Sequence, residues 1–135
     1  PLAARAQLER VRELDPGNLD ALRLLSQALA GSGALEEARR VCRQVLERDP
    51  NDWESHANLA FLLARDDPQR ALEHARRAAE LQPNDLRVRI NLAESYAAAG
   101  DRARAIELFE RLLHDLDADD PYRAVVRSKI RDLRR

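Results

Sequence analysis

The chain has 135 residues, which is enough to bury one hydrophobic core, so we expect a single domain. Lys and Arg (23) balance Asp and Glu (24), and this balance argues against a nucleic-acid-binding protein, which usually has a basic excess. Only 4% of the residues are aromatic, whereas Ala, Leu, Arg and Glu dominate; all four are good helix formers, and the composition is typical of an all-α protein.

The first predicted element is an amphipathic helix within residues 2–16. Leu8, Val11 and Leu14 recur at intervals of three, a spacing that places apolar side chains on one face of a helix. No helix precedes this one in the sequence, so its apolar face has no obvious neighbour. Because the chain also begins at Pro1 without a methionine, we expect it to be excised from a longer protein.

Residues 19–52 are predicted to form two amphipathic helices joined by a tight turn. Gly33 marks the turn, because glycine accepts the left-handed backbone conformation that ends a helix. On both sides of the turn, apolar residues recur at intervals of three and four, as on one face of a helix. They are Leu22, Leu25, Ala28 and Leu29 in the first helix, and Ala38, Val41, Cys42, Val45 and Leu46 in the second.

The same two-helix pattern recurs over residues 53–85 and 86–118. Pro16, Pro50 and Pro83 stand in similar phrases, separated by 34 and 33 residues. Two further series keep this spacing, and their members are Leu25, Leu59 and Leu92, and Ala4, Ala38, Ala71 and Ala105. A fixed period of this length predicts a stack of repeated two-helix units.

One repeat is a residue shorter than the others. In both the leucine and the alanine series, the 33-residue step falls in one place, between Leu59 and Ala71. We therefore expect the turn over residues 65–69, inside the second hairpin, to be shortened by one residue.

Prolines and aspartates mark the boundaries between repeats. Pro50 and Pro83 are expected to stop the second helices, because proline disfavours helical geometry in the residue before it. Asp52 and Asp85 follow these prolines and are placed to cap the next helix.

Asp120 and Pro121 begin a last predicted helix within residues 120–134. Its apolar residues share one face and are Tyr122, Val125, Val126, Ile130 and Leu133. Its arginines fall largely on the other face and are Arg123, Arg127, Arg131 and Arg134. Since each repeat buries its apolar face only against neighbours, we expect this helix to cap the end of the stack.

This pattern resembles the tetratricopeptide repeat family, and the excess of arginine over lysine suggests a bacterial source. The resemblance rests on the 34-residue period, the alanine series, the terminal prolines, Tyr96 and the pairs Leu25-Ser26, Leu59-Ala60 and Leu92-Ala93. It implies an all-α, right-handed superhelical solenoid of helical hairpins. Residues 1–135 would form one domain with a half repeat (2–16), three repeats (19–52, 53–85 and 86–118) and a capping helix (120–134).

The resemblance implies a non-catalytic scaffold that binds a partner protein or peptide. Members of the family commonly bind partners in the concave groove lined by the first helices of the hairpins. By register, the groove residues here are Arg23, Gln27, Asn58, Phe61, Arg65, Arg87, Asn91 and Glu94. Of these, Arg23, Gln27, Asn58, Arg87 and Asn91 partly match a clamp that holds a peptide carboxylate in some members; solvated arginines and commonplace asparagines are the alternative. Phe61 is either an exposed binding residue or a partly buried packing residue.

The biological setting is open to several interpretations. Bacterial families of this appearance often serve envelope assemblies, such as polysaccharide secretion, pilus assembly or cytochrome maturation, and only the resemblance implies such a role. The chain could instead be a recruiting or regulatory arm of a larger enzyme whose catalytic domain lies elsewhere. A homo-oligomer formed through the open N-terminal face is another alternative, although we favour further repeats upstream. RNA binding is disfavoured by the near-zero net charge.

No cofactor or metal site is predicted. Cys42 falls on an apolar helix face, which indicates a buried, inert thiol. The histidines lack metal-binding spacing and are His56, His74 and His114. A run of aspartates from Asp115 resembles the start of a calcium loop, but Asp120 stands where that loop requires glycine. No apolar run approaches the ~20 residues that span a bilayer, and no targeting signal is visible, so cytoplasm and periplasm both stay open.

Overall fold

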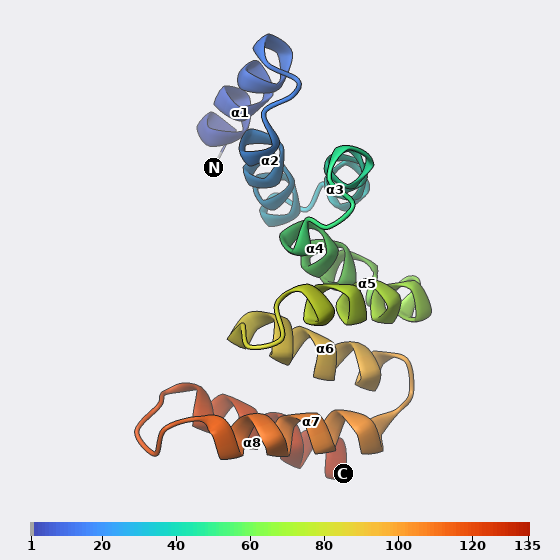
Figure 1. The fold of residues 1–135 in the computed structure, drawn as a ribbon, viewed down its shortest axis with the longest axis vertical. Coiled ribbons are helices and arrows are strands. Elements are labelled where there is room, and N and C mark those ends of the chain that lie inside the picture. Colours follow the sequence, from blue (N-terminus) through green and yellow to red (C-terminus); the bar gives the residue numbers. More distant parts are fainter. Residues whose placement is uncertain (1) are drawn as a thin grey trace.

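The computed structural model describes residues 2–135, which form eight α-helices and no strand. The helices are α1 (Leu2–Leu14), α2 (Leu19–Gly31), α3 (Leu35–Arg48), α4 (Trp53–Leu63), α5 (Pro68–Leu81), α6 (Leu86–Ala98), α7 (Arg102–Asp115) and α8 (Tyr122–Arg134). Figure 1 shows them stacked in chain order along the long axis of the molecule. Each helix packs on the next, and α4 also contacts α2 and α6. The predicted all-α repeat solenoid is confirmed.

Aspartate side chains cap the beginnings of α4, α5, α6 and α7. Asp52 and Asp85 accept hydrogen bonds from the backbone N–H groups of Ser55 and Val88, so both predicted caps are confirmed. Asp67 and Asp101 cap α5 and α7 in the same way. Each cap satisfies a backbone donor that the first helical turn leaves unpaired.

Two of the three hairpins turn through a glycine. Gly33 and Gly100 adopt φ angles of 83° and 93°, in the left-handed region that residues with a Cβ rarely enter. This conformation ends α2 and α6 abruptly and allows turns of only three residues, 32–34 and 99–101.

The central hairpin, which has no glycine, accommodates its missing residue differently from the prediction. The turn between α4 and α5 is not shortened; it spans four residues, 64–67, one more than the other two hairpin turns. The loss falls in α4, which has 11 residues where α2 and α6 have 13. Without a left-handed glycine to reverse the chain, α4 ends early and Asp67 starts the next helix.

The early end of α4 is closed by a side chain from the preceding hairpin. Arg39 of α3 is only 6% exposed, and its Nε lies 3.1 Å from the carbonyl oxygen of Leu62. The same guanidinium donates to Asp66, with 2.6 Å between Nη2 and Oδ2. Carbonyls in the last turn of a helix have no partner within the helix, and Arg39 supplies one here.

The buried residues form three clusters along the stack, and burial declines only toward the N-terminus. Leu25, Leu29 and Leu59 are completely buried between α2, α3 and α4. Toward the C-terminus, Phe109 and Leu112 of α7 pack with the buried face of α8. No residue of α1 is buried, and three leucines at this end are largely exposed: Leu2 (82%), Leu14 (72%) and Leu24 (54%).

Candidate partner-binding groove

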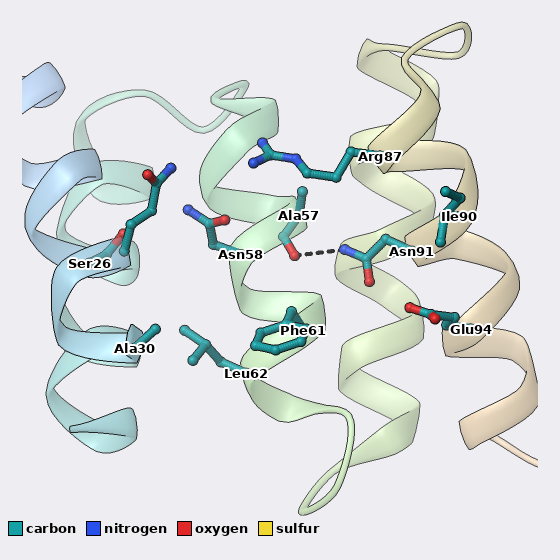
Figure 2. A pocket seen from close by; sticks show the side chains of 11 residues that line it. Ser26, Ala30, Ala57, Asn58, Phe61, Leu62, Arg87, Ile90, Asn91 and Glu94 are labelled. Atoms are coloured by element: carbon teal, nitrogen blue, oxygen red, sulfur yellow. Dashed lines mark hydrogen bonds between the residues drawn. The ribbon is translucent and has the colours of Figure 1, made fainter. Parts of the chain in front are cut away.

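The first helices α2, α4 and α6 share one side of the stack, and a hollow of about 300 Å³ opens there. Figure 2 shows the side chains that line it, with α4 in the middle. Those that the sequence predicted are Gln27, Asn58, Phe61, Arg87, Asn91 and Glu94. Those that it did not predict are smaller or apolar and are Ser26, Ala30, Ala57, Leu62 and Ile90.

A second hollow, of about 670 Å³, adjoins the first on the other side of Phe61. Arg65 lines it, and Phe61, Asn91 and Glu94 line both hollows. The two hollows are called the groove below. Phe61 is 70% exposed at their junction, so it is not the partly buried packing residue of the alternative interpretation.

Arg23 is the one predicted groove residue that lines neither hollow. Its Nε donates to the Asp52 carboxylate over 2.7 Å, and it also pairs with Asp20. Burial alone would raise the pKa of Asp52, but hydrogen bonds from Arg23 and Ser55 lower it below 3.8. The ion pair between Arg23 and Asp52 connects α2 to the N-terminal cap of α4. The Arg23 side chain is therefore engaged by the fold and does not contribute to the groove.

The asparagines at corresponding places in α4 and α6 have different partners. Asn91 donates from Nδ2 to the carbonyl oxygen of Ala57 over 2.8 Å, across the repeat boundary. The corresponding carbonyl of α2 belongs to Arg23, and the Ser26 hydroxyl already donates to it over 2.7 Å. The Nδ2 group of Asn58 is buried and has no partner among residues 2–135. An unpaired buried amide donor costs about 1–3 kcal/mol.

Arg87 and Glu94, two charged side chains of the groove, differ in whether they have an ion-pair partner in the described chain. Arg87 lies over the Trp53 ring, 5.7 Å from its centroid, and has no acidic partner within the described chain. Glu94 is paired with Lys129 of α8. The groove therefore offers two cations without an acidic partner in the described chain, Arg65 and Arg87, together with the exposed amide of Gln27 and an exposed aromatic ring.

Five residues partly match a carboxylate clamp. Three of them line the groove, and their side chains have no hydrogen-bond or ion-pair partner in the described chain: Gln27, Asn58 and Arg87. Arg23 and Asn91 already have partners in the fold. The apolar lining was missed because Ala57 and Ile90 carry no chemical signal in the sequence. Their positions in the repeat register, beside Asn58 and Asn91, could have indicated them.

The cysteine and histidines lie away from the groove. Cys42 is completely buried, and burial raises the pKa of its thiol, as expected for an inert cysteine. His56 of α4 and His74 of α5 face each other with 3.0 Å between their Nδ1 atoms. Within residues 2–135, no three His, Cys, Asp or Glu side chains gather in a way that could hold a metal ion.

Comparison with known sequences decides the family. A sequence model described as tetratricopeptide repeat matches residues 1–60 and 62–128, which is nearly the whole chain. The chain belongs to the tetratricopeptide repeat family. The resemblance inferred from the repeat register is thereby confirmed, and the chain is a protein-interaction scaffold of that family.

One curated relative matches most of this chain. The chain is 36% identical to the probable biofilm formation methyltransferase WspC of Pseudomonas putida. The match extends over 112 residues, which are 82% of this chain. The match covers 26% of that protein, so the chain spans about a quarter of the length of its curated relative.

Solved structures share the fold at low identity. A tetratricopeptide repeat protein from Parabacteroides merdae superposes with a TM-score of 0.82 at 15% identity, over 96% of this chain and 49% of that one. The type III secretion translocator chaperone SycD of Yersinia enterocolitica gives 0.76 at 18% identity, over 89% and 86% of the two chains. In the part of the chain that the structure describes, no helix is long and apolar enough to cross a membrane.

Proposed function

We propose that the groove binds a segment of a partner protein that presents a large apolar side chain and a neighbouring acidic group. The apolar side chain contacts Phe61 and Ile90, and the acidic group faces Arg87. The observation that carries this proposal is that one hollow is lined both by an exposed phenyl ring, Phe61, and by Arg87, an exposed cation with no acidic partner in the described chain. A guanidinium binds a carboxylate through two parallel hydrogen bonds, which gives this contact direction as well as charge.

Loss of two exposed side chains of the groove should weaken partner capture strongly. We expect Phe61→Ala/Arg87→Ala to weaken binding of a partner from source-cell lysate by about tenfold to a hundredfold, since removing a central aromatic or arginine commonly costs over ~1 kcal/mol. Capture on the immobilised domain, followed by titration of the captured protein, measures this.

The matched control removes one exposed aromatic and one exposed arginine elsewhere, as Tyr122→Ala/Arg40→Ala. This variant should retain full capture. Both variants must keep the helical circular dichroism of the wild type. Equal capture by the groove variant and the wild type would contradict the proposal.

A second function is favoured by one comparison. The similarity to WspC covers only 26% of that methyltransferase, which supports the interpretation of these repeats as the recruiting arm of a larger enzyme. The setting would then be a methyltransferase and its target, with the groove holding one of the two. A scaffold in an envelope assembly is the other setting, and the fold shared with a secretion translocator chaperone is compatible with it.

The mass of the protein in source cells distinguishes the two settings. For the enzyme arm, we expect an antibody against this domain to detect a protein well above the 15.3 kDa of this chain, with methyltransferase activity in the immunoprecipitate. The Phe61→Ala/Arg87→Ala change, introduced into the full-length protein, should then reduce methylation of the native target. A protein near 15.3 kDa without transferase activity would exclude the enzyme arm.

A further inference from the structure

Helix α8 stands where the first helix of another repeat would stand. Val126 and Ile130 are buried, and they lie 34 residues after Leu92 and Tyr96, at the corresponding positions of the repeat. In the three hairpins a second helix of 14 residues packs beside each first helix. Among residues 2–135 no second helix packs beside α8, and within this described part of the chain that side of α8 is unpartnered.

The unpartnered side forms a hollow of about 460 Å³ between α7 and α8, separate from the groove. Its apolar lining comes from Leu113 of α7 and from Ala124 and Ile130 of α8. Charged side chains surround this apolar strip: Arg127, Arg131 and Arg134 of α8, and Glu110 of α7, which pairs with Arg134. An apolar strip between charges is the complement of an amphipathic helix.

The charge of this end is strongly one-sided. Residues 122–135 hold six basic side chains and one acidic, although the whole chain has a net charge of −1. Four of the six are occupied: Arg123 donates to backbone carbonyls of α7, and Lys129, Arg134 and Arg135 pair with Glu94, Glu110 and Asp132. Arg127 and Arg131 have no acidic partner in the described chain, and both are exposed.

The repeat register also shows which kinds of helix do not fit the hollow between α7 and α8. Arg127 occupies the place where Ser26, Ala60 and Ala93 stand in the three repeats, close to their second helices. A long cation there keeps an ordinary second helix from close approach. The α1 helix of another copy, itself a second helix by register, carries three arginines against two glutamates and offers no charge complement. The lining has no aromatic ring on which a nucleic-acid base could stack.

We propose that the hollow between α7 and α8 binds an acidic amphipathic helix of a partner protein, about as long as the second helix of a repeat. Its apolar face covers Leu113 and Ile130, and its carboxylates pair with Arg127 and Arg131. This contact gives the scaffold a second binding surface at its C-terminal end, independent of the groove.

Two synthetic 14-residue helical peptides test the proposal by fluorescence anisotropy. Both carry leucines along one face; one has glutamates beside them and the other has lysines in their place. The glutamate peptide should bind the wild type and weaken with added salt, and the lysine peptide should not bind. Arg127→Glu/Arg131→Glu should weaken binding by about tenfold or more, because two ion pairs become repulsions.

Arg40→Glu/Arg43→Glu, the same charge change at two exposed positions of α3, is the matched control and should bind like the wild type. Phe61→Ala/Arg87→Ala should also bind normally, which separates this surface from the groove. The proposal is overturned if the two arginine pairs behave alike or if no binding is detected at about 1 mM peptide. It is also overturned if single-stranded RNA or anionic vesicles displace the glutamate peptide at lower concentration.

Discussion

Replacing Arg39 by methionine is expected to lower the free energy of unfolding by about 2–3 kcal/mol. The guanidinium of Arg39 is buried and donates to the Leu62 carbonyl oxygen at the end of α4, a helix two residues shorter than its counterparts. Methionine fills a similar volume but donates no hydrogen bond, so this carbonyl would lose its partner in a nearly dry position. Urea denaturation monitored by circular dichroism measures the change.

The neighbouring residue provides the control. Arg40 is exposed on the same helix, and Arg40→Met should change the free energy of unfolding by less than about 0.5 kcal/mol. Asp66→Asn tests the ionic part of the contact separately. Because Asp66 is 67% exposed, its loss should cost only about 0–1 kcal/mol. If Arg39→Met were as stable as the wild type, Arg39 would not be the group that closes α4.

Acidification from pH 7 to pH 5 is expected to lower the free energy of unfolding by about 1–2 kcal/mol through His74. Burial and the neighbouring charges of His56, Arg70 and Arg43 lower the pKa of His74 from 6.5 to about 4. In the unfolded chain His74 is therefore protonated below about pH 6.5, whereas in the folded protein it is protonated only below about pH 4. Stability is full above pH 6.5 and falls as the pH drops, and partial exposure of the ring keeps the effect below its ceiling.

His56 and His74 lie side by side at the interface of α4 and α5. The Nε2 of His56 lies 2.8 Å from the Pro50 carbonyl oxygen, so this nitrogen is the donor of that hydrogen bond. The two Nδ1 atoms lie 3.0 Å apart, so one of them donates and the other accepts. Burial is the first cause of the lowered pKa of His74 and gives the effect its sign.

A histidine substitution isolates the effect. His74→Leu should remove most of the loss of stability between pH 7 and pH 5, whereas His114→Gln, at an exposed position of α7, should retain it. The pKa of Asp52 is lowered from 3.8, so this carboxyl does not titrate in the same window. An unchanged pH dependence in His74→Leu would refute the assignment.

Most of the fold could be predicted because a solenoid repeats its contacts at a fixed offset. Once the leucine and alanine series defined the period, the helices, the caps at Asp52 and Asp85 and the left-handed glycines at Gly33 and Gly100 followed from local chemistry. The same register placed Asn58, Phe61 and Arg87 on one surface, and the structure brings them around one hollow.

Contacts between different positions of neighbouring repeats could not be predicted in this way. Arg23 was expected in the groove, but the buried cap residue Asp52 holds it, and nothing local to either residue indicates that pairing. The missing residue was assigned to the right hairpin and to the wrong part of it. The turn is one residue longer than the other two because, without glycine, the chain reverses less tightly than at Gly33, and α4 is shorter instead.

The sequence by itself therefore determined the helices, their order and the family of this protein, because those depend on periodicity and on groups a few residues apart. Only the tertiary structure decided which polar side chains have a hydrogen-bond or ion-pair partner within the fold. Arg39 donates a hydrogen bond to a carbonyl oxygen 23 residues away. The Ser26 hydroxyl donates to the Arg23 carbonyl oxygen, which would otherwise be the acceptor for Asn58. Arg87 has no acidic partner in the described chain. The physical reason is that hydrogen bonds depend on distances of about 3 Å between atoms that packing, and not spacing along the chain, brings together.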